Sequence, residues 1–175
     1  MRKVGAPIAA IIAMGTVAAL LVVLFTALNP VGATIGIVLA TVALLIVVAS
    51  FVWLDRFEPE PPRLLVLAFA WGASVAVVFS VILEMVFESL VPLDAETASA
   101  ATIALGAPLI EEALKGAFLL LMLTGRRRSE LNSLPDCLVY AGITAIGFAW
   151  VENIMYIAQG ESCLLYTSPS PRDRS

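Results

Sequence analysis

Residues 100–124 read AATIALGAPLIEEALKGAFLLLMLT, and this segment indicates the class of protein. A transmembrane helix needs about 20 mostly apolar residues, and the segment meets that requirement. Its centre nevertheless carries Glu111, Glu112 and Lys115. A charged side chain at that depth costs at least ~2.5–3.5 kcal/mol on insertion scales, and such charges usually mark a functional site. The segment therefore predicts a membrane protein with a chemical site inside the bilayer.

The composition of the whole chain agrees with a membrane protein. Of the 175 residues, 61% are hydrophobic and 14% are charged, whereas a soluble domain is about half apolar and about a quarter charged. Basic residues are not interleaved with aromatic ones, so nucleic-acid binding has no support. The two cysteines could form one pair at most, which excludes a disulfide-stapled scaffold.

Five segments are long and apolar enough to cross a bilayer. The chain is therefore predicted to be an all-α, polytopic membrane helix bundle with about five transmembrane helices. The first segment follows Arg2 and Lys3 and could be a signal peptide, but its apolar run exceeds the roughly 7–15 residues of a signal core, so a retained helix is expected. The predicted spans are residues 4–28, 33–54, 64–91, 100–124 and 137–158.

The basic residues predict the orientation of the bundle. If the spans alternate in direction, all seven Lys and Arg residues that flank them fall on one side, and the opposite loops contain none. Basic loops stay in the cytoplasm, so the N-terminus is expected there. The flanking basic residues are Arg2, Lys3, Arg56, Arg63, Arg126, Arg127 and Arg128.

Helical spacing places Lys115 beside both glutamates of the fourth span. It lies four residues after Glu111 and three after Glu112, so it can reach either carboxylate. The two glutamates are about 100° apart around the helix axis, so one could face a pocket while Lys115 holds the other. Carboxylates in such a place suit general acid–base catalysis. The alternative is a structural ion pair that locks helices together.

A second polar cluster lies on the fifth span, in the sequence GFAWVEN of residues 147–153. Glu152 is roughly 22 Å along the helix from residue 137, which puts it at a depth similar to that of Glu112 on the antiparallel fourth span. A site between the two helices is therefore predicted, with Asn153 able to bond a carboxylate or a substrate carbonyl. The alternative is that Glu152 is an interfacial residue and Phe148 an ordinary packing residue. Glu84 and Glu88, near the end of the third span, are also expected at the interface.

These motifs resemble those of the PrsW family of intramembrane proteases. Order and spacing agree from about residue 53 to residue 156, and the combination of Glu-Glu-x-x-Lys with Phe-x-x-x-Glu-Asn on the next helix is fairly specific. The matching stretches are residues 55–61, 68–73, 108–116, 136–142 and 147–153.

The resemblance implies a membrane-embedded endopeptidase of the bacterial plasma membrane. Its substrate would be a membrane-anchored regulatory protein, and its catalytic residues would be Glu111, Glu112 and Glu152, supported by Lys115 and by the pair Asn153 and Phe148. It also implies zinc or another divalent metal, held here by Glu112 and Glu152 together with a histidine. The chain contains no histidine, and a zinc site normally takes three protein ligands.

The end of the chain differs in character from the rest. The string CLLYTSPSPRD of residues 163–173 looks like the translation of a transposase-type sequencing adapter; a real disordered Ser/Pro-rich tail is the alternative. Residues 1–161 are therefore predicted to form the transmembrane domain, with the motifs in residues 53–156, and residues 162–175 to be a disordered artefact. A fragment that stops before the family's histidine motif is expected to be inactive.

Two other functions remain compatible with these residues. Buried carboxylates and a lysine also suit a proton- or ion-coupled carrier, and a non-catalytic scaffold or immunity-type protein could retain the fold. For the peptidase, Glu111 or Glu112 would deprotonate water, with or without a metal. Asn153 or Lys115 would stabilise the oxyanion.

Overall fold

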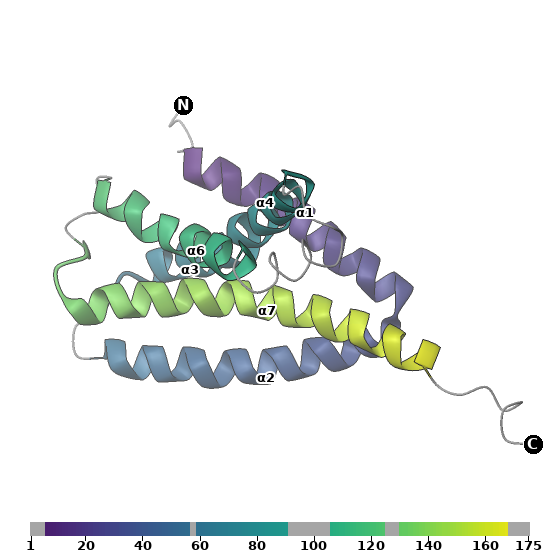
Figure 1. Ribbon diagram of the computed structural model, residues 1–175. Coiled ribbons are helices and arrows are strands. Elements are labelled where there is room, and N and C mark those ends of the chain that lie inside the picture. Colours follow the sequence, from purple (N-terminus) through teal and green to yellow (C-terminus); the bar gives the residue numbers. More distant parts are fainter. Residues whose placement is uncertain (1–5, 57–58, 91–105, 125–129, 168–175) are drawn as a thin grey trace, which may run out of the picture.

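The computed structural model describes residues 6–56, 59–90, 106–124 and 130–167. Every element in these ranges is a helix, so the predicted all-α class is confirmed. Helices α3, η1 and α4 follow one another without a break and form one rod (Figure 1). The helices are α1 (Ala6–Leu28), α2 (Pro30–Asp55), α3 (Pro62–Ala70), η1 (Trp71–Ala76), α4 (Val77–Leu90), α6 (Ala107–Thr124) and α7 (Leu134–Thr167).

Four stretches of the described chain are long and apolar enough to span a membrane, which makes this a multi-pass membrane protein. The remaining predicted span is α6, whose 18 described residues contain the three central charges; residues 100–105 of that prediction lie outside the described part. The four stretches are Ile8–Leu28, Pro30–Leu54, Pro62–Phe87 and Leu134–Gly160.

Helices α2 and α7 lie side by side and antiparallel, and they form the most extensive helix contact of the fold (Figure 1). At one end, the Asn29 side chain caps α2 by accepting the Gly32 N–H at 3.1 Å and donates to the Ala158 carbonyl at 2.8 Å. Near the middle, the Trp150 indole donates to the Thr41 hydroxyl at 3.1 Å. Residue pairs that meet along the contact include Asn29 with Ala158, Gly36 with Ile154, Thr41 with Trp150 and Phe51 with Gly142.

Two glycines let the rod of α3 and η1 cross α7 at very close range. A Cβ on Gly72 would lie 1.9 Å from the Thr144 carbonyl oxygen, and a Cβ on Gly147 would lie 2.3 Å from the Phe69 carbonyl oxygen. Membrane helices associate through such small residues because lipid supplies no hydrophobic force between them. The crossing brings the GFAWVEN segment of α7 against the third span.

The helix ends next to the basic loops gather on one side of the bundle. The end of α2, the start of α3, the end of α6 and the start of α7 lie together at the left of Figure 1. There the Tyr140 hydroxyl donates to the Glu60 carboxylate at 2.6 Å. Asp136 accepts the N–H groups of Asn132 and Ser133, as expected of an acid at the start of a helix. The loop arginines 126–128 lie outside the described residues.

Two features differ from the sequence prediction. Helix α7 continues to Thr167, so residues 162–167 are helical where disorder was expected; the adapter origin of the tail stays a prediction. The third span is interrupted by a π-helical turn, η1.

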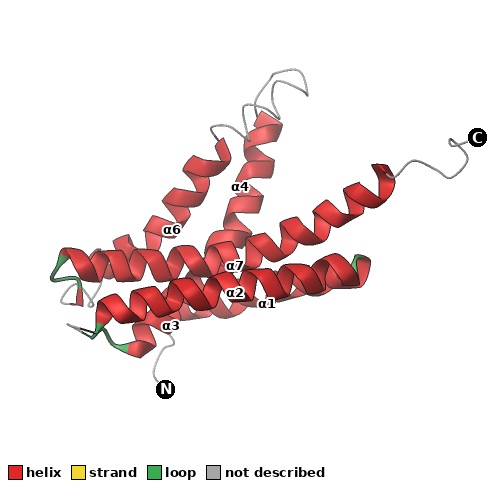
Figure 2. Ribbon diagram, turned by 90° about the horizontal axis from the view of Figure 1, so that it is seen from below, coloured by secondary structure: helices red, strands yellow, loops and turns green. Residues whose placement is uncertain are grey.

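Viewed from below, α4 and α6 lean away from the layer that contains α1, α2 and α7 (Figure 2).

The π-helical turn is tied to α6 through its first residue. The Trp71 indole N–H donates to the Leu114 carbonyl at 3.0 Å, and the Trp71 ring packs on Phe118 with centroids 6.1 Å apart. Trp71 is 8% exposed, so the contact belongs to the core. Leu114 directly precedes Lys115, and the third span therefore holds the charged segment of α6 at a set height.

Replacing Trp71 by phenylalanine should lower the thermal denaturation temperature of the protein in detergent. The change removes a buried hydrogen bond worth about 1 kcal/mol and part of the ring packing, which corresponds to a loss of about 2–4 °C or more for a chain of this size. Trp53→Phe is the matched control, because Trp53 is 60% exposed. Equal shifts for the two variants would contradict the role given to Trp71.

Candidate functional site

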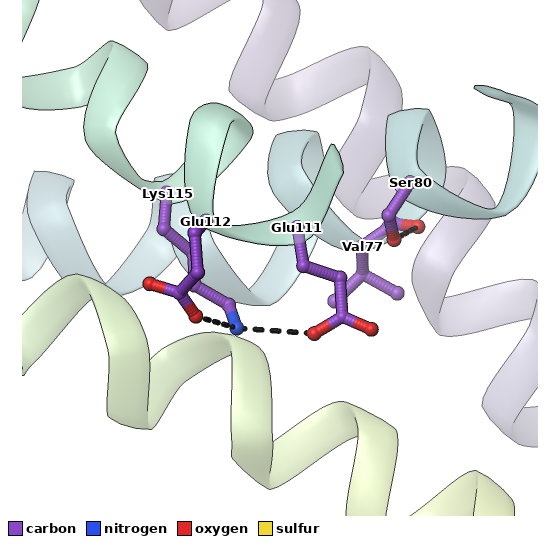
Figure 3. Close-up of polar contacts among 5 residues, drawn as sticks. All are labelled: Val77, Ser80, Glu111, Glu112 and Lys115. Atoms are coloured by element: carbon purple, nitrogen blue, oxygen red, sulfur yellow. Dashed lines mark hydrogen bonds and ion pairs between the residues drawn. The ribbon is translucent and has the colours of Figure 1, made fainter. Parts of the chain in front are cut away.

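Lys115 bridges the two glutamates of α6. Its Nζ lies 3.2 Å from Glu111 Oε2 and 2.9 Å from Glu112 Oε1, as helical spacing predicts (Figure 3). The Lys115 side chain is 14% exposed, Glu111 19% and Glu112 73%. The two carboxylates therefore differ in surroundings although they share one partner.

A cavity of about 340 Å³ lies between four helices and contains three carboxylates. Glu111 enters it from α6, Glu152 from α7 and Glu84 from α4. Most of the remaining wall is apolar, contributed by residues such as Leu21 of α1 and Val77 of α4. The site is thus an apolar cavity with a few converging polar groups, which is the usual form of a ligand or active site.

The predicted glutamates do not all meet. Glu111 and Glu152 line the same cavity, whereas Glu112 lines a second one, with Lys115 and Gly116 on its wall. Lys115 links Glu112 to Glu111, which lines the first cavity. Asn153 is exposed and is not among the residues that line the cavity of Glu111 and Glu152.

Phe148 also contacts the Lys115 ammonium. Lys115 Nζ lies 4.0 Å from the centroid of the Phe148 ring, and Phe148 is 2% exposed. A cation over the face of an aromatic ring is attracted by the ring quadrupole. The phenylalanine of the GFAWVEN segment is therefore more than a packing residue, because it restrains the ammonium that binds Glu111.

Glu84 and Tyr156 were missed as site residues. Glu84 was expected at the interface, but it lines the cavity together with Glu111 and Glu152. Tyr156 lines the cavity one turn after Glu152. Helical spacing in the sequence could have indicated both residues. Glu84 lies four residues after Ser80 and Tyr156 lies four residues after Glu152, so each pair shares one helix face.

The donor set does not match a zinc site. Among the described residues, no three His, Cys, Asp or Glu side chains are grouped so that they could hold a metal ion. Zinc prefers nitrogen and sulfur donors and three or four protein ligands, and here a lysine ammonium occupies the position between Glu111 and Glu112. The predicted metal ligands Glu112 and Glu152 line different cavities. The described residues therefore do not form the predicted metal site.

Comparison with known proteins identifies the chain at the level of the family. The description "PrsW family intramembrane metalloprotease" matches residues 60–165, which is more than half of the chain. No matching curated protein and no matching solved structure was found. The match includes α6, the rod of α3, η1 and α4, and most of α7, so it covers every carboxylate of the cavity. The chain therefore belongs to the PrsW family of intramembrane proteases.

Proposed function

We propose that this protein hydrolyses a peptide bond of a membrane-anchored regulatory protein, with Glu111 as the general base. The observation that carries the proposal is that Glu111 and Glu152, from consecutive helices, line one apolar cavity inside the membrane domain. Family membership favours a peptidase over a proton- or ion-coupled carrier or a non-catalytic scaffold.

Glu111 is the better candidate for the base because of where its carboxylate lies. It reaches the cavity, while the Glu112 side chain is 73% exposed on the other side of Lys115. In the proposed reaction, Glu111 takes a proton from water and the resulting hydroxide attacks the scissile carbonyl carbon. The protonated Glu111 then gives that proton to the leaving amine, so that the carboxylate is restored.

The other polar groups of the site have supporting roles in this proposal. Glu152 faces Glu111 across the cavity and accepts a hydrogen bond from the water or from the scissile N–H. The Tyr156 hydroxyl can donate to the oxyanion, a role expected from the sequence for Asn153 or Lys115. Lys115 is instead held by two carboxylates and fixes the orientation of Glu111.

The family description implies a divalent metal, but the proposed steps do not use one. The described residues do not supply a group of three ligands for it. For the orientation, we propose a cytoplasmic N-terminus in a bacterial plasma membrane, which the gathering of helix ends near Arg56 and Arg63 supports.

The mechanism can be tested with the protein in liposomes that contain a panel of single-span reporter peptides. In a single turnover in ¹⁸O-labelled water, a general-base mechanism puts one ¹⁸O atom into the new carboxyl terminus. Cleavage without that label would indicate attack by a protein carboxylate, and no cleavage of any reporter would overturn the peptidase.

Replacing Phe148 by leucine should slow cleavage by about tenfold, since a cation–π contact in a desolvated place is worth about 1–2 kcal/mol. Phe148→Tyr retains the aromatic face and should keep most of the rate. The measurement is kcat on one reporter peptide, with thermal denaturation as a check on folding. A leucine variant as fast as the wild type would contradict the role of the ring.

A further inference from the structure

Ser80 is a buried polar side chain on the wall of the cavity, and the proposed reaction gives it no role. It belongs to α4, it is 3% exposed, and it lines the cavity together with Glu111 and Glu152. The residues of α4 that line the cavity on either side of it, Val77 and Val81, are apolar. Ser80 therefore places a hydroxyl group in an otherwise apolar part of the wall.

The hydrogen bond that Ser80 makes decides what its oxygen can do. Its hydroxyl lies 2.9 Å from the Val77 carbonyl oxygen (Figure 3). A carbonyl has no hydrogen to give, so the serine is the donor in this bond. Its single hydrogen is then committed to the helix backbone, and the lone pairs of Oγ can only accept. Ser80 thus offers the cavity a neutral acceptor, which suits an O–H or N–H group.

The residues that line the cavity differ in burial, which distinguishes a closed part from an open part. Ser80 and Phe148 are 3% and 2% exposed, whereas Tyr156 is 63% exposed. Phe148 lies against the Lys115 ammonium, and the same ammonium binds Glu111. Ser80 therefore belongs to the closed part of the cavity, which is also the part that holds the Glu111 carboxylate.

We propose that Ser80 is a further catalytic residue, whose hydroxyl oxygen accepts one hydrogen of the attacking water while Glu111 accepts the other. A buried water molecule needs two to four polar partners, and here they come from two different helices, α4 and α6. When both of its hydrogens are held, the water presents a lone pair to the scissile carbonyl carbon, which is the orientation that attack requires. This inference rests on the proposed peptidase function.

Ser80 neither gains nor loses a proton in this step. Glu111 removes the hydrogen that faces it, and the oxygen of the water forms a bond to the carbonyl carbon. The hydrogen bonded to Ser80 stays on that oxygen and leaves for solvent only when the new carboxyl group ionises. Because the water is held by Ser80 and Glu111, Glu152 serves as the acceptor for the scissile N–H.

Replacing Ser80 by alanine removes the acceptor and should lower kcat on one reporter peptide by about tenfold, which is the usual worth of one buried hydrogen bond. KM should stay within about twofold, because Ser80 binds the water and not the peptide. Ser80→Thr retains a hydroxyl at the same position and should keep most of the rate. An unchanged thermal denaturation temperature for Ser80→Ala would show that the loss arises from chemistry.

Ser74→Ala is the matched control. Ser74 lies on the same span, is 4% exposed, and donates its hydroxyl to the Ala70 carbonyl, so the change removes the same kind of hydrogen bond. It lines a different cavity, with Gly15 and Ala18 of α1 on its wall. This variant should retain at least about half of the wild-type kcat.

The outcomes separate this inference from the function on which it rests. If Ser80→Ala is as fast as the wild type, or if Ser74→Ala loses as much kcat, the role of Ser80 is overturned and the peptidase stands. A loss that appears in KM with kcat unchanged would also overturn it, since the hydroxyl would then bind the substrate. If the wild-type protein cleaves no reporter, the peptidase function fails and the role of Ser80 fails with it.

Discussion

Glu111→Gln is expected to reduce the rate of cleavage by about 10²–10⁴-fold, which is the usual contribution of a general base. Glutamine keeps the size of the side chain and one oxygen that Lys115 can still bond, so the fold should be preserved while the proton acceptor is lost. Glu112→Gln is the matched control, because it makes the same change on the next residue and also keeps a bond acceptor for Lys115. It should retain at least about a tenth of the wild-type rate, since Glu112 lies outside the cavity of Glu152.

The measurement is kcat/KM on one reporter peptide, with the thermal denaturation temperature recorded for each variant. Similar temperatures for both variants would show that the difference in rate arises from chemistry. If Glu112→Gln loses as much activity as Glu111→Gln, or more, the assignment of the base to Glu111 is wrong, and the base is the second glutamate of the motif.

Gly72→Ala is expected to destabilise the membrane domain by at least about 3 kcal/mol, because overpacking of this kind forces backbone shifts. The new Cβ would lie 1.9 Å from the carbonyl oxygen of Thr144, which belongs to the backbone of α7 and cannot rotate away. For a chain of this size, the thermal denaturation temperature in detergent should fall by roughly 6–12 °C.

Gly116→Ala is the control for that experiment. A Cβ on Gly116 meets nothing within 4 Å, and alanine favours a helix over glycine by about 1 kcal/mol. This variant should be as stable as the wild type or slightly more stable. A Gly72→Ala protein with an unchanged denaturation temperature would show that α7 and the third span do not approach each other so closely.

Much of the architecture was accessible from the sequence because a bilayer imposes simple rules. Long apolar segments must be helices in lipid, where every backbone group has to be bonded within its own segment. The spacing of Glu111, Glu112 and Lys115 predicted the bridging lysine, since helix geometry alone decides which side chains can meet. The short link between α6 and α7 predicted that these helices are antiparallel neighbours.

The sequence did not predict which of the adjacent residues Glu111 and Glu112 points into the cavity. Which of two adjacent residues points into a cavity depends on the rotation of α6 about its axis. That rotation is set by contacts distant in sequence, such as Trp71 with Leu114 and Lys115 with Phe148. Helical spacing therefore predicted the Glu111–Lys115–Glu112 cluster but not the separation of Glu112 from Glu152.

Glu84 was missed for a different physical reason. Its place on the cavity depends on how the third span is rotated about its axis, and no residue of the sequence WGASVA announces that a π-helical turn replaces an α-helical one there. The close approach of Gly72 to Thr144 is a tertiary contact, and it occurs within the segment that changes the register. Sequence periodicity assumes a constant turn and fails where the turn changes.

Chemical cross-linking can measure directly which glutamate of α6 faces Glu152. The pairs Glu111→Cys with Glu152→Cys and Glu112→Cys with Glu152→Cys are prepared in the background lacking Cys137 and Cys163, and each is treated with a short bifunctional thiol reagent in liposomes. Rapid cross-linking is expected for positions 111 and 152, which share a cavity, and little or none for positions 112 and 152. Preferential cross-linking of positions 112 and 152 would mean that the catalytic cavity is built around the other glutamate.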